Sequence, residues 1–502
     1  MNGVFGFTPL TSESAFMPQI LRTLVLLLPV LANAFSQSSF AEEPSESKHA
    51  KKPNIVFLLA DDLGWTGTGS FGSDFYETPN LDGMVQDGIK FTNAYAACTV
   101  CSPTRASIMT GMYPARLRCT DFIAGQNRPK AKLKIPDWTK QLESRHVTIA
   151  EALKEDGYRT AHVGKWHLNS PTSRRTPDGT DALSQGFDVS IQKPDGTKGY
   201  FLRSGKAKTN AKEGYVTDWL TDQACDYIAE SAEAEEPFFL YFAYHTPHTP
   251  IQGRPDLVEK FRAKVDAKGI HRNPAYAAMV ASLDQSVGRV LDALKSNGLE
   301  ENTIVIFTSD NGGLTQRYGV HDNFTENLPL RRGKGSAYEG GVRVPAIVKW
   351  PGNLPAGAQS DTPIITIDYY PTLLALAGAR GNEKHNLNVD GVNLLPVFKN
   401  PEHEFGRNLY WHYPHYHAGG DGPYSSIRQG NYRLIEFFED QSLRLYDLGK
   451  DIGEKRDLSR DLPEKTAALH ADLKAWRKRI AAQLPSPNPN WDPTNDGSGR
   501  NK

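Results

Sequence analysis

The run Pro53-Asn-Ile-Val-Phe-Leu-Leu-Ala60 is followed at once by Asp61-Asp62. It is continuously apolar and of strand length, which predicts a strand covered on both faces, as in a parallel sheet. In open α/β sheets, ligand sites gather at the carboxyl ends of strands. The adjacent carboxylates of Asp61 and Asp62 are therefore candidate ligands for a hard cation, with a solvated turn as the alternative.

A second apolar run, Asn302–Ser309, ends in Asp310-Asn311. A carboxylate and an amide oxygen at a strand end repeat the pattern of Asp61 and Asp62. If the two endings converge, they form an oxygen-rich cage suited to Ca²⁺ or Mg²⁺.

A third run of this kind, Pro237–Tyr244, leads into His245-Thr-Pro-His248. This places a turn with two histidines where the sheet is expected to bind its ligand. A histidine that merely caps a proline-stiffened loop is the alternative.

The central stretch for chemistry is Cys101-Ser-Pro-Thr-Arg105. Ser102 can cap a helix and Pro103 suits its first turn, so Cys101 is expected just before a helix N-terminus, where an anion is favoured. Arg105 adds a permanent cation one turn later. The alternatives are a redox pair with Cys98, half of a metal site, or a buried, inert thiol.

Two further segments carry cations. In Gly157–His167, alternation along a strand would place Lys165 and His167 on one face, where they suit an anionic ester, while an ordinary surface is the alternative. The glycine-rich segment 330–345 carries Lys334, but Gly335 follows it, so the spacing of a nucleotide-binding P-loop is not met.

The N-terminus has the pattern of a signal peptide over residues 1–41. Arg22 precedes a short apolar core, and cleavage is expected after Ala34 or Ala41. The core is too short to span a membrane. The sequence thus predicts export to the periplasm or the exterior, with residues 42–52 as a flexible lead-in.

The remaining chain divides into a large domain, 53–400, and a C-terminal subdomain, 401–484. Short alternating runs after residue 408 predict a small antiparallel sheet, and Pro463–Ala482 predicts a helix. Residues 485–502 read as a mobile tail. The segment Tyr410–His417 is rich in aromatic and imidazole rings, which could line a sugar subsite or belong to an ordinary packed strand.

Composition excludes some classes of function. The chain has 502 residues and a formal net charge of −1, which argues against binding of nucleic acid or membrane surfaces by bulk electrostatics. Its four cysteines do not make a disulfide scaffold, although one bridge among Cys98, Cys119 and Cys225 is allowed.

Taken together, these motifs resemble the type I sulfatases, of the arylsulfatase and N-acetylgalactosamine-6-sulfatase kind and of the exported bacterial type. Cys-x-Pro-x-Arg at 101–105, followed by Thr110-Gly111, looks like the first signature of that family, and 157–167 looks like the second. The resemblance runs from Pro53 to the end of the chain. It implies an alkaline-phosphatase-like α/β fold, with a large, mostly parallel sheet between helices and a small C-terminal subdomain.

The resemblance also implies a mechanism. Cys101 would be oxidised by a formylglycine-generating enzyme, and a hydroxyl of the hydrated aldehyde would attack sulfur. Ca²⁺, with Mg²⁺ the less favoured ion, would be bound by Asp61, Asp62, Cys101, Asp310 and Asn311. Arg105 would hold residue 101, His167 would act as a base, and His248, preferred over His245, would protonate the leaving group. Lys165, His248 and Lys334 would contact the sulfate ester.

The expected activity is that of a sulfuric ester hydrolase acting on a sulfated carbohydrate. The sugar, the sulfate position and the oligomeric state are not readable. Three alternatives stay open: a phosphonate or phosphodiester hydrolase of the same fold, an inactive glycan-binding relative, and a thiol–disulfide protein using Cys98 and Cys101.

Overall fold

The computed structural model describes most of the chain, namely residues 51–171, 179–195, 197–202, 214–266, 268–315 and 323–494. The predicted signal peptide, most of the lead-in and the last residues of the predicted tail lie outside the described residues. Residues 51–502 form one compact unit. No helix within the described ranges is long and apolar enough to cross a membrane.

The large sheet has eight strands in the order β12-β2-β11-β10-β1-β9-β5-β6. Their bounds are β1 (Asn54–Ala60), β2 (Ile89–Phe91), β5 (Arg159–Gly164), β6 (Val189–Ile191), β9 (Phe238–Ala243), β10 (Thr303–Ser309), β11 (Ala346–Lys349) and β12 (Ala358–Ser360). Strand β11 is antiparallel to β10 and β2, and the other neighbours run parallel. The three long apolar runs become β1, β9 and β10, as the sequence predicts.

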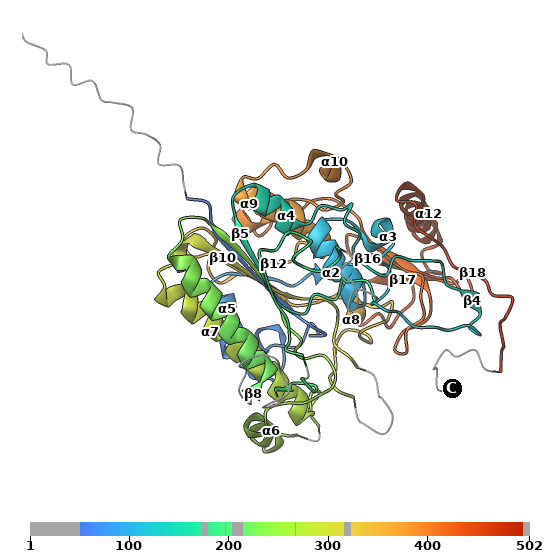
Figure 1. Cartoon of the computed structure of the whole chain (residues 1–502). Coiled ribbons are helices and arrows are strands. Elements are labelled where there is room, and N and C mark those ends of the chain that lie inside the picture. The colour runs from blue at the N-terminus through green and yellow to red at the C-terminus, as the bar shows by residue number, and fades with distance from the viewer. Residues whose placement is uncertain are drawn as a thin grey trace, which may run out of the picture. The chain divides into compact units, whose positions relative to one another are not determined.

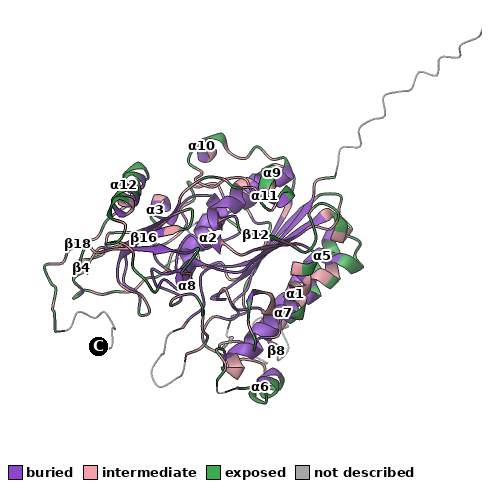
Figure 2. Cartoon of the chain, turned by 180° about the vertical axis from the view of Figure 1, so that it is seen from behind, coloured by how far each residue is buried: buried purple, intermediate pink, exposed green. Residues whose placement is uncertain are grey.

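Strand β1 shows why its sequence does not alternate. Ile55, Phe57 and Leu59 enter one apolar cluster, and Val56 and Leu58 enter another, each of them fully buried. Helices α2, α4 and α9 supply the first cluster, and α1, α5, α6 and α7 supply the second. Figures 1 and 2 show the sheet between these two layers. A strand with both faces dry must be apolar at every position.

Helix α2 forms where the Cys101 segment predicts one, and α12 forms where Pro463–Ala482 predicts one. Their bounds are α1 (Pro79–Gln86), α2 (Cys101–Thr110), α3 (Pro114–Leu117), α4 (Ile149–Glu155), α5 (Val216–Ala232), α6 (Pro255–Arg262), α7 (Pro274–Ser296), α8 (Glu339–Val342), α9 (Tyr369–Ala377), α10 (Glu383–Asn386), α11 (Leu395–Lys399) and α12 (Pro463–Arg479). The 3-10 turns are η1 (Gly69–Phe71), η2 (Glu300–Asn302) and η3 (Thr366–Asp368).

The C-terminal region forms the predicted antiparallel sheet, in the order β14-β15-β16-β17. Its strands are β14 (Leu409–Tyr413), β15 (Tyr424–Gln429), β16 (Tyr432–Phe437) and β17 (Leu443–Asp447), and α12 packs on β15, β16 and β17. Trp411 and Tyr413 share an apolar cluster with Tyr95 and Val100 of the larger part.

Short two-stranded pairings complete the fold: β3 (Ala94–Tyr95) with β13 (Ile364–Ile365), β4 (Leu133–Lys134) with β18 (Ser486–Pro487), and β7 (Phe201–Leu202) with β8 (Gly214–Tyr215). The β4–β18 pair joins the first residues of the predicted tail to a loop 350 residues earlier in the chain. Asn488 adds side-chain hydrogen bonds to the carbonyls of Pro129 and Ala131, at 2.9 and 2.6 Å.

Two local predictions are wrong in detail. Helix α2 begins at Cys101, with Val100 in the cap position, and the Ser102 hydroxyl instead accepts a hydrogen bond from the Ile123 N–H at 3.1 Å. Strand β5 ends at Gly164, so Lys165 and His167 lie in a loop rather than on one strand face. A Cβ at Gly164 would come within 2.0 Å of the Ala243 carbonyl oxygen, which requires glycine at this strand end.

Candidate active site

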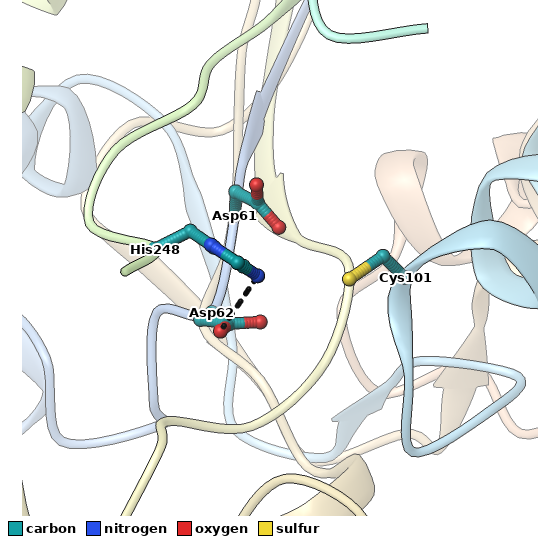
Figure 3. Close-up of side chains that lie close together, drawn as sticks. All are labelled: Asp61, Asp62, Cys101 and His248. Atoms are coloured by element: carbon teal, nitrogen blue, oxygen red, sulfur yellow. Dashed lines mark ion pairs between the residues drawn. The ribbon is translucent and has the colours of Figure 1, made fainter. Parts of the chain in front are cut away.

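Four strand ends and one helix start meet at the carboxyl edge of the large sheet. Asp61 and Asp62 follow β1, Asp310 and Asn311 follow β10, and Cys101 starts α2. Lys165 follows β5 and His248 follows β9. Figure 3 shows Asp61, Asp62, Cys101 and His248 pointing toward one another. Ligand atoms of these four side chains all lie within 4.8 Å of one another.

Arg105 contacts the acidic residues at the ends of both β1 and β10. Its Nε and Nη2 donate to Asp310 Oδ2 at 2.9 and 2.7 Å, and its Nη1 donates to the Lys165 carbonyl at 2.7 Å. Nη2 also lies 3.6 Å from Asp61 Oδ1. The guanidinium is fully buried, so its fixed fork sets the spacing between β1, β10 and the loop after β5.

Two lysines bind the carboxylates of Asp61 and Asp62. Lys165 Nζ donates to Asp61 Oδ2 at 2.6 Å, and Lys334 Nζ donates to both oxygens of Asp62 at 2.7 and 2.9 Å. Lys334 Nζ also lies 3.3 Å from Cys101 Sγ. A group attached to residue 101 would therefore be held between two ammonium groups, which favours an anionic ester.

The two predicted catalytic histidines differ in environment. His248 Nδ1 bonds to the Thr249 carbonyl at 2.7 Å, and its Nε2 lies 3.7 Å from Asp62 Oδ2. His167 Nε2 bonds to the Ile123 carbonyl at 2.7 Å, which assigns the proton to Nε2 and leaves Nδ1 as an acceptor. His167 Nδ1 is buried without a hydrogen-bond partner. It is thus available to accept a proton inside the site.

Charge balance fixes the protonation of the site. Burial acts to raise the pKa of Asp61, but Lys165, His248 and Arg105 outweigh it and hold that pKa well below the usual value. Burial together with the charge of Asp61 raises the pKa of Asp310 to about 7. Burial also lowers the pKa of both histidines, with Lys334 adding to the effect at His248 and Lys165 at His167. Both imidazoles are therefore neutral at neutral pH.

The same groups fit a hard divalent cation. Asp61 Oδ1 and Asn311 Oδ1 are buried and accept no hydrogen bond. Asn311 Nδ2 donates to Asp62 Oδ1 at 2.7 Å, which fixes the amide with its oxygen available. Two carboxylates and an amide oxygen in a buried pocket are the donor set that Ca²⁺ prefers. Asp310 is committed to Arg105 through Oδ2 and to the Asp62 N–H through Oδ1, at 3.2 Å.

Backbone strain accompanies two of these residues. Asp62 has φ +66° and His167 has φ +60°, the left-handed region that residues with a Cβ rarely adopt. Such conformations persist only where surrounding contacts enforce them, and they cluster at functional sites. For Asp62 the contacts include Tyr276, whose hydroxyl donates to the Asp62 carbonyl at 3.1 Å.

The cysteines disfavour the redox alternative. All four are free thiols, so the allowed bridge among Cys98, Cys119 and Cys225 does not form. Burial raises the pKa of Cys101 to about 12, against the opposing charges of Lys165 and Lys334, and burial also raises the pKa of Cys98. Thiol exchange needs an accessible thiolate, and neither group provides one at neutral pH.

Tyr200 lies near the site and was not predicted from the sequence, whereas His417 belongs to the segment Tyr410–His417 that the sequence singles out. Tyr200 donates from its hydroxyl to the carbonyls of His245 and His248 and so holds the histidine turn in place. His417 lies against Gly335, where a Cβ would come within 1.9 Å of its Nδ1. Tyr200 follows a long polar segment without a motif, and nothing in the sequence singles it out.

The segment containing His417 was predicted to be either a sugar subsite or a packed strand. Trp411, Tyr413 and Tyr416 are buried, and the Trp411 indole donates to the Ala96 carbonyl at 2.8 Å. The packed alternative describes most of this segment, and His417 alone among these residues approaches Lys334.

Comparison with known proteins agrees with this geometry. The "Sulfatase" family model matches residues 53–379, and the model "N-sulphoglucosamine sulphohydrolase, C-terminal" matches residues 333–482. The chain is 31% identical to a protein named "Sulfatase" from Formosa agariphila, over 93% of this chain and 94% of that protein. It is 32% identical to human arylsulfatase A, over 82% and 84%. It is also 32% identical to the dog N-acetylgalactosamine-6-sulfatase, over 74% and 69%.

Among solved structures, the chain resembles Ps i-CgsB in complex with k-i-k-neocarrahexaose. The TM-score is 0.70 at 29% identity, covering 89% of this chain and 96% of the other. The fold is thus alkaline-phosphatase-like, as the sequence predicts. The chain belongs to the sulfatase family, and it is a sulfuric ester hydrolase.

Proposed function

We propose that this chain is an exported sulfatase that removes sulfate from a sulfated carbohydrate by means of a formylglycine made from Cys101. The observation that supports this most is the position of Cys101 Sγ. It lies 3.3 Å from Lys334 Nζ and within 4.8 Å of ligand atoms of Asp61, Asp62 and His248. A nucleophile at this point faces both the anion-binding cations and the oxygen donors.

Oxidation of Cys101 resolves a mismatch in the donor set. A neutral thiol is a soft, weak partner for a hard cation, whereas the hydrated aldehyde offers oxygen. We infer that Asp61, Asp62, Asp310, Asn311 and oxidised residue 101 hold Ca²⁺. Bound there, the ion would polarise the sulfate oxygens and ease ionisation of the attacking hydroxyl.

The chain's own residues then divide the remaining work. Lys165 and Lys334 would neutralise charge on the sulfate oxygens, the electrostatic stabilisation that grows toward the transition state. His248, whose Nδ1–H donates to the Thr249 carbonyl, faces the leaving alcohol through Nε2. It would first take up a proton there, with the nearby Asp62 and the anionic ester favouring the charged form, and would then deliver that proton to the leaving oxygen. His167, fixed through Nε2 by the Ile123 carbonyl, would accept at Nδ1 the proton of the second hydroxyl as sulfate departs. Arg105 would keep residue 101 and the β1 and β10 ends in register.

The carbohydrate class rests on the names of similar proteins. One is named N-acetylgalactosamine-6-sulfatase, and one solved structure is a complex with k-i-k-neocarrahexaose. The predicted signal peptide supports action outside the cytoplasm, and N-terminal sequencing of the mature protein should find Phe35 or Glu42 first.

The direct test is mass spectrometry of the Cys101 peptide from protein produced together with a formylglycine-generating enzyme. The peptide should carry the aldehyde, and the matured protein should hydrolyse aryl sulfates and a subset of defined sulfated saccharides. Aryl phosphate and phosphonate esters serve as the comparison. Faster turnover of those esters would identify a phosphonate or phosphodiester hydrolase, and an aldehyde without any turnover would identify a glycan-binding relative.

A further inference from the structure

One surface carries a concentration of charge that the catalytic residues do not use. The basic loop, residues 126–140, holds one carboxylate, Asp137, and five cations, Arg128, Lys130, Lys132, Lys134 and Lys140, in a chain whose net charge is −1. The four lysines are exposed and Arg128 is half-buried. Like charges gathered on a short segment repel one another, so their retention at one place points to an anionic ligand.

The basic loop borders a cleft of about 410 Å³. Arg128, Lys134 and Lys140 line it together with Trp138 and Asn127. Lys140 Nζ lies 5.5 Å from the centre of the Trp138 ring. An aromatic face beside cations and amide groups suits a sugar ring that carries sulfate, because the ring packs on the indole while the ester meets the lysines.

The loop is held in a defined position. Strand β4 within it pairs with β18, and the Leu133 N–H donates to the Tyr416 hydroxyl at 3.0 Å. The amide side chain of Asn488 binds the carbonyls of Pro129 and Ala131. Figures 1 and 2 both show β4 beside β18. A fixed loop presents its charges in a constant arrangement, as a binding surface requires.

The cleft is connected to the active site by a continuous row of residues. His417 lies against Gly335, the residue after Lys334, and its ring contacts Phe122 edge-on with ring centres 6.0 Å apart. Burial lowers the pKa of His417 to about 3, and the charges of Lys334 and Arg128 add to that shift while Asp62 opposes it. The row of cations thus runs from Lys334 through Arg128 into the cleft.

Two lysines of the cleft, Lys134 and Lys140, are not paired with a carboxylate among the described residues. Within the described residues, no carboxylate forms an ion pair with Lys132, Lys134 or Lys140, whereas Lys130 lies 3.4 Å from Asp492. The larger cleft of about 740 Å³ beside Thr249 has a balanced lining, with Arg272 and Glu326 as its charged side chains.

We propose that the basic loop binds sulfate esters on the sugars next to the one being desulfated, so that the substrate is a carbohydrate chain with several sulfate groups. This rests on the proposed function and specifies its substrate class. The target ester enters the site at residue 101, and the neighbouring sugars lie along Arg128 toward Trp138, Lys134 and Lys140.

The test compares two double variants of the full chain. Lys134→Gln with Lys140→Gln removes two charges of the cleft. Lys295→Gln with Lys384→Gln removes two exposed lysines elsewhere and is the matched control. Calorimetry measures binding of a sulfated dextran oligosaccharide at low and high salt. The cleft variant should bind roughly tenfold more weakly, with a smaller salt dependence, while the control stays within about twofold of the parent protein.

Two results would overturn the proposal. One is equal binding by the cleft variant and the control. The other is binding of a single-stranded DNA of equal charge as tightly as the sulfated dextran, which would define a general polyanion surface. Hydrolysis of a small aryl sulfate is measured in parallel and should be the same in all three proteins. A parent protein that binds sulfated dextran through the cleft but turns over no sulfate ester would contradict the proposed function alone.

Discussion

Two buried clusters of charge among the described residues can be compared, and one of them has the features of a catalytic site. The first surrounds Asp61 and Asp62, and the second surrounds Glu339, where α8 meets the C-terminal sheet. In the second, Arg433 pairs with Glu339, and both side chains are completely buried. In the first, the side chains of Lys165 and His248 keep 12% and 32% of their exposure. A ligand can therefore reach the first cluster, and the second is sealed.

The two clusters also differ in the buried oxygen atoms that have no hydrogen-bond partner. Around Asp61 the orphan oxygens belong to an ionised carboxylate and an amide. Around Glu339 the orphan oxygen is Glu454 Oε1, and burial raises the pKa of that carboxyl to about 8, so it holds a proton at neutral pH. Buried charge alone thus does not identify a site. Unpaired anionic oxygen together with an opening to solvent does, because that combination leaves room for a cation and a substrate.

The largest expected effect comes from removing the nucleophile of the first cluster. Cys101→Ala should lower aryl sulfate turnover by roughly 10⁴-fold or more, because it removes the side chain from which the proposed nucleophile is made. Cys98→Ala is the matched control, since Cys98 is equally buried three residues earlier. Full activity of Cys101→Ala, or an equal loss in Cys98→Ala, would end the assignment.

The next prediction separates the two clusters through their arginines. Arg105→Met removes the guanidinium that is bonded to Asp310, and Arg433→Met removes one of the guanidinium groups paired with Glu339, which keeps Arg343. Arg105→Met should lower the free energy of unfolding by about 3–5 kcal/mol, and Arg433→Met by less. Only Arg105→Met should also lose activity per folded molecule, by on the order of 10²–10³-fold, because it positions the β1 and β10 ends. Denaturant titration and aryl sulfate kinetics measure the two effects. Should Arg433→Met lose as much activity while folded, the sealed cluster would be part of the catalytic machinery.

The first cluster is predictable from the sequence and the second is not, because only the first is built from residues that follow recognisable strands. Asp61, Asp62, Asp310 and Asn311 each follow a continuous apolar run, and parallel strands deliver their ends to one edge. Glu339 starts helix α8 and Arg433 lies on strand β16, 94 residues later in the chain. Their contact depends on how β16 packs on α8, which no local pattern encodes.

Errors within the site have a similar origin. The alternating pattern predicts a strand that continues through Lys165 to His167, whereas β5 ends at Gly164. That end depends on the close approach of the Ala243 carbonyl, which the local sequence does not show. Tyr200 and the pairing of β4 with β18 depend on contacts between distant segments. Residue types at strand ends were predictable, and the loops that position them were not.

Metal removal should distinguish the clusters by a smaller amount. Ca²⁺ at one hundred times its dissociation constant should stabilise the matured protein by about 2.7 kcal/mol, and a chelator should reverse this. Asn311→Ala should abolish the stabilisation because it removes one of the two orphan oxygens. Arg433→Met should remain stabilised by Ca²⁺. Unfolding curves that do not respond to Ca²⁺ or chelator would contradict the cation site.

The smallest effect concerns pH and the sealed cluster. Burial and the charge of Glu339 raise the pKa of Glu454 to about 8, against the opposing charge of Arg433. Between its ordinary pKa and 8, folded Glu454 keeps a proton that the unfolded chain releases. The native state then binds more protons, so the free energy of unfolding falls as pH rises, by up to about 1.4 kcal/mol per pH unit from this group.

Glu454→Gln cannot ionise at this position, so the fall in the free energy of unfolding between pH 5.5 and 7.5 should be smaller in this variant, as measured by denaturant unfolding. Aryl sulfate turnover should not change, since the cluster is closed to substrate. Identical slopes in the two proteins would show that Glu454 is ionised and that the second cluster carries an unpaired charge after all.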